Sequence, residues 1–512
     1  MPSPVPLQKE KMIPMPAVAA GLGTAAAYYT WPFLISLRMG HYIILGLLLV
    51  LVLIISFIRV LKNFPGEKRK ALYKISVIAV AAALGFSMGI DARRSVKEAP
   101  DLGLEMKSII AVSGTLKEDP RTLSGGSGFG FLDLSETSAQ GGIRASAGGN
   151  VMVFFPAESI PRLKEFGRGS EIYVDGNFSQ KENRLLFNAS SVHIVKPAKD
   201  LEQKRTFIRM MLLEKFQSRQ DKRYEGGGAP VWGPLASALL LGMRDDLDVD
   251  LSIGFKNSGC AHILALSGMH LAILSGILAF LIRKPLGLRK ASVVGAAFII
   301  AYVFIAGSQP SLVRSAIMYL IGTISLWGFL KGKPISLLCM AFVIQLVLQS
   351  YSGVTLSFIL SYLALAGILT LGVSLRTLFR GRIPDFLSVS LSASLGAFIF
   401  TAPVVAFYFN SLKPIGILVG LFIAPLSALF MVLALIALAV SFLPLPLWSI
   451  MDFILTQVYR LFEFTVSLAG RVPGISVSNP LPVLIFSVLF WVLIIVIVKK
   501  DYAYRSSIAS FD

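Results

Sequence analysis

Cysteine, histidine and charge are all scarce in this chain of 512 residues. It has two cysteines, Cys260 and Cys339, four histidines and 15% charged residues. Neither cysteine belongs to a Cys-x-x-Cys pair and both lie in or beside apolar segments, which argues against a disulfide framework and a thiolate metal site. No Gly-x-x-x-x-Gly-Lys-[Ser/Thr] loop occurs, so a phosphate-binding loop of that kind is also absent. We therefore expect no metal and no cofactor.

Apolar residues dominate instead. They make up 55% of the chain, and its mean hydropathy is +0.72. This composition predicts a polytopic α-helical membrane protein with room for one modest soluble domain. The formal net charge of +19 is of the kind that nucleic-acid-binding proteins show. Much of it, however, lies in short loops between apolar runs, where the positive-inside rule explains it without a ligand.

The first 95 residues predict an N-terminal membrane anchor. Three apolar runs lie at about 15–36, 41–60 and 72–90, and the first lacks a clear signal-peptide cleavage pattern. Lysines and arginines cluster between the second and third runs, which places that loop in the cytoplasm. The third span then crosses outward, so we expect residues 91–259 to be extracytoplasmic.

Residues 100–197 change character. Apolar and polar residues alternate in five short segments, which Gly- and Ser-rich turns separate. Five strands of this length suit a small barrel of the OB type, a common platform for single-stranded nucleic acid and oligosaccharides. Residues 100–200 hold 11 Lys/Arg against 12 Asp/Glu, so this domain has no basic footprint. Its aromatic residues either fill the core or stack bases; they are Phe129, Phe131, Phe154, Phe155 and Tyr173.

Positive charge follows the barrel, in the segment 198–230. From Lys196 to Arg223 there are nine Lys/Arg against four Asp/Glu, with apolar residues at helical intervals. This pattern indicates either an amphipathic helix on the outer membrane surface or a helix that attracts phosphates at a channel mouth. A Gly-rich hinge, 225–230, ends it. The candidate DNA-binding residues are Lys204, Arg205, Arg209, Lys215 and Arg219.

The most informative stretch carries two of the four histidines, His262 and His270, around Ser267 and Gly268. Titratable side chains at the mouth of a membrane helix are costly and usually line an aqueous path or a site. On one ideal helix, His262, Ser267 and His270 can all face the same side. Gly268 lets another helix approach closely. The alternative is that the histidines only hydrogen-bond between packed helices.

Residues 231–498 form the expected membrane core, followed by a tail at 499–512. Arg314 lies a turn inside one span, where a guanidinium needs a carboxylate, a carbonyl or a bound anion, unless it reaches back to the outer surface. The orientation after about residue 410 stays open, because either a re-entrant segment broken at Pro425 or a spanning 448–468 satisfies the charge rule. Apolar runs predict spans at about 260–282, 291–306, 311–330, 334–350, 356–373, 386–409, 414–441 and 480–498.

Four stretches, in this order, resemble the ComEC-type competence proteins, the inner-membrane channels for transforming DNA. The resemblance covers roughly residues 70–498. It implies a cytoplasmic-membrane protein whose OB-like domain receives DNA outside and whose helical core passes a single strand inward. The four stretches are Leu239-Leu-Leu-Gly-Met-Arg-Asp-Asp-Leu247, Gly259-Cys-Ala-His-Ile-Leu-Ala-Leu-Ser-Gly-Met-His270-Leu, Pro310-Ser-Leu-Val-Arg-Ser-Ala-Ile-Met318 and Ser357-Phe-Ile-Leu-Ser-Tyr-Leu-Ala-Leu-Ala-Gly367.

The chain also departs from that family. Many members carry a C-terminal metallo-β-lactamase-like nuclease with a His-x-His-x-Asp-His cluster, and some carry a cysteine pair in the soluble domain; this sequence has neither. We therefore expect no nuclease activity, which leaves open a separate nuclease. Gly420 stands where the family pattern often has Asn. The resemblance implies single-stranded DNA, membrane lipid, a cytoplasmic ATP-driven translocase and an extracytoplasmic DNA receptor as partners, and leaves a homo-oligomer open.

The expected roles follow from a polyanion that must cross lipid through a wet, locally positive corridor. Arg314 screens phosphates along the path, while Asp245 and Asp246 hold the mouth through salt bridges. A transporter of another envelope solute on the same fold is one alternative. The other is an intramembrane enzyme with Ser267 as nucleophile and a histidine as base, although no Gly-x-Ser-x-Gly elbow is present. The residues expected to line or brace the path are His262, Ser267, Gly268, His270 and Ser361.

Overall fold

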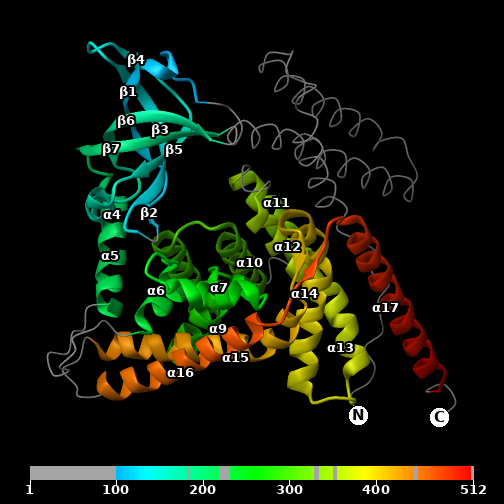
Figure 1. Cartoon of the computed structure of the whole chain (residues 1–512). Helices are drawn as coiled ribbons and strands as arrows, with labels where there is room; N and C mark the ends of the chain where they lie inside the picture. The colour runs from blue at the N-terminus through cyan, green and yellow to red at the C-terminus, as the bar shows by residue number, and fades with distance from the viewer. Residues whose placement is uncertain are drawn as a thin grey trace, which may run out of the picture.

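The computed structural model describes residues 100–508 apart from six short gaps. These gaps are residue 124 and residues 182–183, 218–230, 328–333, 350–354 and 442–447. The predicted N-terminal anchor at 1–95, the hinge at 225–230 and the candidate DNA-binding residue Arg219 lie outside the described residues. The described chain forms a sheet domain and a helical domain, which helix α5 connects (Figure 1).

The sheet domain is a closed barrel. Strands β1, β6, β7, β5 and β3 are neighbours in that order, and a further pairing of β1 with β3 closes the sheet. β5 and β7 pair in parallel, and the other pairs are antiparallel. The predicted sheet is therefore confirmed. The elements are η2 (Met106–Ser108), β1 (Ile109–Leu116), β2 (Arg121–Thr122), β3 (Gly128–Ala139), β4 (Arg144–Ser146), β5 (Asn150–Phe155), η3 (Ala157–Ser159), α4 (Ile160–Phe166), β6 (Glu171–Lys181) and β7 (Arg184–Lys196).

Alternation along the strands separates the barrel core from its outer face. In β5 every second residue is buried, because successive side chains of a strand point to opposite faces. Phe155 is buried in the core with Phe187, whereas Phe129 and Phe154 are half-buried outside it. These two outer rings face each other across β3 and β5, with centroids 6.3 Å apart. The predicted aromatic set is thus divided between core and surface.

Helix α5 (Asp200–Gln217) connects the barrel to the helical domain and packs against α4, α6 and α9. Its apolar residues do not form one free stripe: Leu213 and Phe216 are buried, while Leu201 and Phe207 are more than 60% exposed. The described part of the basic segment is therefore a docked connecting helix. This differs from the predicted helix lying on a surface, because spacing alone cannot show which partners a helix meets.

The helical domain supports a multi-pass membrane protein. Five helices are long and apolar enough to cross a bilayer: α9, the stretch Leu356–Phe379, α14, α15 and the first part of α17. α17 continues through the predicted tail as far as Ile508. The elements are α6 (Gly233–Leu241), α7 (Val249–Asn257), α8 (Ala261–Leu264), α9 (Gly268–Ala306), α10 (Pro310–Leu326), α11 (Pro334–Leu348), α12 (Leu356–Gly367), the π-helical turn η5 (Ile368–Gly372), α13 (Val373–Phe379), α14 (Asp385–Phe409), β8 (Ser411–Leu412), α15 (Ile415–Val440), α16 (Trp448–Gly470), β9 (Ile475–Ser476) and α17 (Leu481–Ile508).

α9 is a hairpin of two helical arms. Gly287 has non-helical angles, φ 72° and ψ 166°, in its middle, which glycine adopts without a steric penalty. Leu271 from the first arm and Ile299 from the second belong to one buried cluster, so the arms fold back on each other. The two spans predicted at 260–282 and 291–306 are these arms. The first arm, however, begins at Gly268 and not at residue 260.

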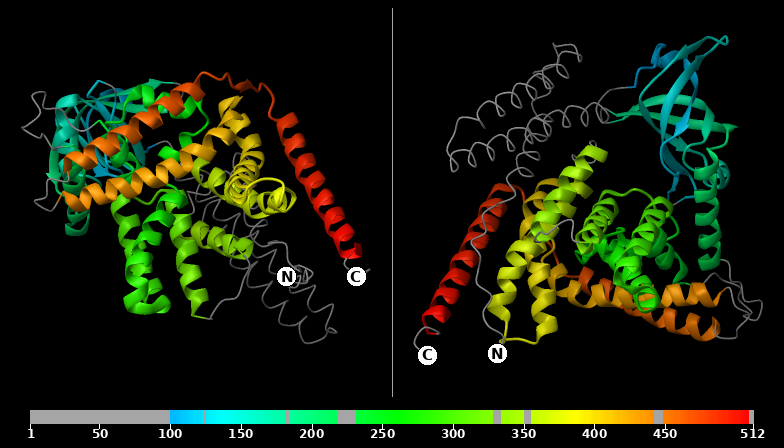
Figure 2. Two further views of the ribbon diagram at one scale, coloured as in Figure 1. Left: turned by 90° about the horizontal axis from the view of Figure 1, so that it is seen from below. Right: turned by 180° about the vertical axis from the view of Figure 1, so that it is seen from behind.

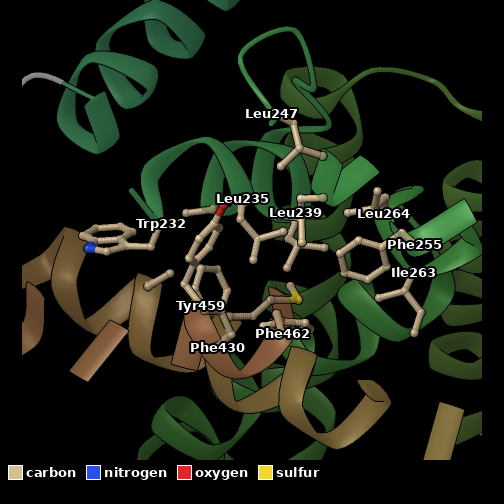
Figure 3. Close-up of a cluster of buried hydrophobic side chains, with 14 of the residues drawn as sticks. Trp232, Leu235, Leu239, Leu247, Phe255, Ile263, Leu264, Phe430, Tyr459 and Phe462 are labelled. Atoms are coloured by element: carbon tan, nitrogen blue, oxygen red, sulfur yellow. The ribbon is translucent and has the colours of Figure 1, made fainter. Parts of the chain in front are cut away.

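α15 and α16 lie side by side beneath the short helices α6 and α7 (Figures 1 and 2). α15 continues through Pro425, so the proposed break at that proline is wrong. Phe430 of α15 and Phe462 of α16 meet Phe255 of α7 in the largest apolar cluster (Figure 3). Burying a phenylalanine stabilises the fold by about 1.5–3 kcal/mol. This cluster therefore fixes the platform on which α8 and the start of α9 rest.

Candidate functional site

The chain breaks its helical course between Leu264 and Gly268. α8 ends at Leu264, Ser267 is extended with φ −124° and ψ 173°, and α9 starts at the next residue. The prediction that His262 and His270 share one helix face is therefore wrong. His262 is exposed on α8, whereas His270 is fully buried on α9. The cause is local: an N-cap residue must leave the helical angles for its side chain to bond the first turn.

Ser267 and His270 form a reciprocal cap at the start of α9. The Ser267 side chain accepts from the backbone N–H of His270. The Ser267 backbone N–H donates to Nδ1 of His270 at 2.9 Å. Because Nδ1 accepts this bond, the proton of the neutral imidazole must lie on Nε2. Nε2 is buried and has no hydrogen-bond partner among the described residues, so a buried donor is left available.

Arg314 lies on α10, beside the start of α9. Its side chain is 8% exposed, so it does not reach back to the surface. Nη1 donates to the backbone carbonyl of Ser361, and the guanidinium lies 5.8 Å from the ring centre of Tyr362. Nε of Arg314 is buried and has no hydrogen-bond partner in the part of the chain that the structure describes. Among the described residues no carboxylate pairs with Arg314, so a carbonyl and a ring are its only counterparts there.

Small and polar residues hold these elements together. Ser311 Oγ donates to the carbonyl of Leu266 at 2.6 Å, which ties α10 to the break. A Cβ on Gly268 would stand 2.6 Å from Ser315 Oγ and 3.3 Å from Nη2 of Arg314. A larger residue at this position would therefore force the Ser315 side chain to move. We call the set Ser267, Gly268, His270, Arg314 and Ser361 the polar junction; all five were predicted as path residues, and the structure brings them together.

Two residues that sequence reasoning missed complete the junction. Gln345 of α11 is fully buried. Its Nε2 donates to the carbonyl of Pro310 at 2.9 Å, and its Oε1 accepts from the hydroxyl of Tyr362 at 2.9 Å. A lone glutamine inside an apolar run was the available signal, since polar side chains in membrane segments usually serve a site or a helix contact.

A second group of charges joins the barrel to the helical domain. Asp119 accepts from Arg205 Nη2 at 2.8 Å and from Arg209 Nη1 at 2.6 Å. Arg205 Nε also donates to the carbonyl of Phe304, near the C-terminal end of α9, at 2.9 Å. Burial alone would raise the pKa of Asp119, but the charges of Arg209 and Arg205 hold it below its ordinary value of 3.8. Arg205 and Arg209, predicted as DNA contacts, are therefore docking contacts in this structure.

The remaining predicted residues lie on α5 and in the loop between α6 and α7. Asp245 pairs with Lys164 of α4 at 2.8 Å, so it forms a salt bridge as expected, although its role at a mouth stays a prediction. Asp246 and Lys204 are exposed, and Lys215 is half-buried. DNA binding by Lys204 and Lys215 stays a prediction as well. Among the described residues no three His, Cys, Asp or Glu side chains gather closely enough to hold a metal ion.

Comparison with known proteins identifies a matching protein family and two relatives. The family model described as Competence protein matches residues 239–501. ComE operon protein 3 of Bacillus subtilis (strain 168) is 27% identical over 273 residues, which are 51% of this chain and 34% of that protein. An uncharacterized protein of Aquifex aeolicus (strain VF5) is 24% identical over 347 residues, 67% of this chain and 77% of that one. No solved structure matches the chain.

The extent of these matches defines what they show. The alignment with ComE operon protein 3 spans about a third of that relative's length. The matched residues 239–501 cover half of this chain and include the whole polar junction. The chain belongs to the Competence protein family.

Proposed function

We propose that this chain passes single-stranded DNA inward across the cytoplasmic membrane during natural transformation. The observation that carries the proposal is Arg314, a buried cation in an apolar helix that has a carbonyl and a ring but no carboxylate among the described residues. A buried charge without a counter-ion is costly. A phosphodiester strand supplies one negative charge per nucleotide, so it can compensate this cation while it passes.

The other donors of the polar junction support a polyanion as the cargo. His270 Nε2 and Arg314 Nε are both buried, and neither has a hydrogen-bond partner within the described residues. The N-terminus of α9, where the backbone N–H groups point outward, lies beside them. Gly268 keeps side-chain atoms away from the guanidinium. Every unsatisfied group there is a donor, which suits phosphate oxygens.

The barrel supports the same proposal. A closed sheet of five main strands, with helix α4 between the third and fourth, supports our proposal that this domain is of the OB type. Phe129 and Phe154 are half-buried on its outer face, where aromatic rings can stack bases. We therefore propose that the barrel lies outside the cytoplasmic membrane and receives the strand. Membership of the Competence protein family favours DNA over another envelope solute.

Partners follow from the same proposal. A strand moved in one direction needs an energy source, and we propose a cytoplasmic ATP-driven translocase for it. An extracytoplasmic DNA receptor delivers the duplex, and a separate nuclease degrades the second strand. A second copy of the chain is a further candidate partner. Each of these partners is expected to co-purify with the full chain from cells taking up DNA.

Transformation by cells that carry this chain as their only family member tests the proposal. Removing the chain is expected to abolish transformants and the entry of labelled DNA into the cytoplasm. Growth on small solutes is expected to be unchanged, since the path is built for a polyanion. If the cells still take up DNA but lose uptake of one small solute, the chain is a transporter on the same fold.

The distance of 3.0 Å between Ser267 Oγ and His270 Nδ1 raises the enzyme alternative, which a serine-directed fluorophosphonate can test. We expect no covalent adduct on Ser267, because Nδ1 already accepts the Ser267 amide and is not a free base. Mass spectrometry of the treated full chain measures this, with Ser267→Ala as the background. Ser267→Ala removes a helix cap and is expected to cost about 1 kcal/mol. A stoichiometric adduct on Ser267 contradicts the channel assignment.

A further inference from the structure

A row of five side chains crosses the outer face of the barrel, with one residue from each of five neighbouring strands. Arg121 of β2 lies opposite Phe129 of β3, which lies opposite Phe154 of β5. Phe154 in turn lies opposite Asn188 of β7, and Asn188 lies opposite Asn177 of β6. Residues that lie opposite each other in neighbouring strands project from the same face of a sheet. The neighbours of the two phenylalanines along β3 and β5 are buried, so the row points outward; we call it the outer row.

The two aromatic rings in the middle of the outer row are spaced for an unstacked strand. The ring centres of Phe129 and Phe154 lie 6.3 Å apart, and the guanidinium of Arg121 lies 6.0 Å from the centre of the Phe129 ring. In a stacked duplex strand, successive nucleotides advance by only about 3.4 Å. Two consecutive bases can therefore each cover one ring only when the strand is stretched and its own stacking is lost. This spacing suits a single strand and does not match a duplex.

A second row beside the outer row widens the apolar surface. Phe131 of β3 lies opposite Met152 of β5, and Met152 lies opposite Leu186 of β7. All three are half-buried and lie two residues along their strands from the outer row, which places them on the same outer face. Apolar side chains that gather on an outer face mark a contact site, whereas scattered ones do not. The flat faces of bases match this surface better than charged phosphates do.

The other end of the outer row is polar and lies beside a hollow. The Asn188 side chain donates through Nδ2 to Ser179 Oγ at 3.0 Å. Next to it is an open hollow of about 550 Å³, whose lining includes Asn177, Asn188 and Asp175. Amide and carboxylate side chains form hydrogen bonds with the edges of bases, whereas a carboxylate repels a phosphate. This end of the row therefore suits the edge of a base.

The charge of the barrel leads to the same conclusion. Residues 100–200 hold 11 Lys/Arg against 12 Asp/Glu, and Arg121 is the single cation of the outer row. Arg121 already pairs with Glu118 at 3.2 Å, and both side chains are more than half exposed. Phosphates therefore find little attraction on this face, so a strand that binds here is held mainly through its bases.

We propose that the outer row holds the incoming strand by its bases and thereby selects single strands over duplex DNA. The inference rests on the proposed function and adds the means by which the barrel recognises its substrate. Consecutive bases stack on Phe129 and Phe154, and a following base turns its edge toward Asn188. In a duplex the faces of the bases are covered by their neighbours, so the stacking contacts cannot form.

Binding of three labelled ligands to the full chain in lipid nanodiscs tests this inference. They are an oligothymidine of about 12 nucleotides, an abasic strand with the same sugar-phosphate backbone, and a duplex of the same length. We expect the oligothymidine to bind at least about 10-fold more tightly than either of the others, because only its bases can stack on the rings. Phe154→Leu is expected to lower the oligothymidine affinity about 10-fold and to leave the affinity for the abasic strand unchanged.

Two matched variants separate stacking from folding. Phe154→Trp keeps a ring that can stack and is expected to bind the oligothymidine at least as tightly as the wild-type chain does. Tyr173→Leu removes a half-buried ring of β6 that lies outside the outer row, and it is expected to change neither affinity.

The outcomes also separate this inference from the proposed function. Equal affinity of the wild-type chain for the oligothymidine and the abasic strand overturns this inference alone, because the membrane core can still bind the backbone. Binding of chitohexaose that is lost in Phe154→Leu assigns the outer row to a glycan and likewise overturns the inference. Transformation that persists after removal of the chain overturns the proposed function instead.

Discussion

Arg314→Gln is expected to lower the transformation frequency by about 10- to 100-fold while the chain remains in the membrane at normal abundance. A hydrogen bond to a charged group contributes about 1.5–3 kcal/mol, and 1.4 kcal/mol corresponds to a factor of ten. The substitution is expected to weaken the contact with the passing DNA and to leave the packing of the helices intact. Among the described residues no carboxylate pairs with Arg314, so none would lose its partner. Transformants and membrane-fraction protein are counted in the same cultures.

A matched variant separates this effect from packing. Gln345→Met removes two buried hydrogen bonds, to Pro310 and from Tyr362, without removing a charge from the junction. It is expected to lower abundance and transformation together. Arg314→Lys keeps a point charge but loses the planar fork, so an intermediate frequency is expected. If Arg314→Gln lowers abundance as much as transformation, Arg314 is a structural residue and the phosphate path must lie elsewhere.

Periodicity alone predicted much of the architecture. Apolar runs located the long helices of the membrane core, and alternation located the five main barrel strands. Periodicity did not predict the break between Leu264 and Gly268, because the residues there are as apolar as those of a continuous helix. The decisive feature was the reciprocal cap of Ser267 and His270, in which a histidine takes the place of the usual Glu or Gln.

The docking role of Arg205 and Arg209 was beyond sequence reasoning for a different reason. Both pair with Asp119, which is 86 and 90 residues away along the chain. The sequence of a helix rich in Lys and Arg does not reveal whether its side chains bind phosphates or pair with a carboxylate far away along the chain. The five junction residues could be singled out from the sequence, because their three sequence stretches carry polar residues that lipid alone does not explain. Their role in a DNA path stays a prediction.

Asp119→Asn is expected to weaken the docking of the barrel by about 2–3 kcal/mol. Asp119 is 28% exposed, whereas Arg205 is 3% and Arg209 11% exposed. Removing one partner of a buried pair costs about 3–5 kcal/mol, and the value is lower here because Asp119 is partly exposed and asparagine keeps an acceptor. Hydrogen exchange of α5 amides in the full chain measures it, as protection lower by about 30- to 150-fold. Glu118→Gln, one residue away in an exposed pair, is expected to leave exchange unchanged.

The contact of Asp119 with Arg205 and Arg209 is expected to weaken at acid pH, because it depends on the ionised carboxylate of Asp119. Because the folded state holds the pKa of Asp119 below its ordinary value of 3.8, the stabilisation is complete above about pH 4 and is lost as the pH falls through the lowered pKa. Asp119→Asn, which cannot titrate, is expected to remove this dependence while remaining weakly docked at neutral pH. When Asp119 is protonated, Arg205 loses its shorter carboxylate contact and keeps Glu202, at 3.5 Å, and the carbonyl of Phe304. Identical acid profiles for α5 exchange in wild type and Asp119→Asn would show that another group holds the barrel in place.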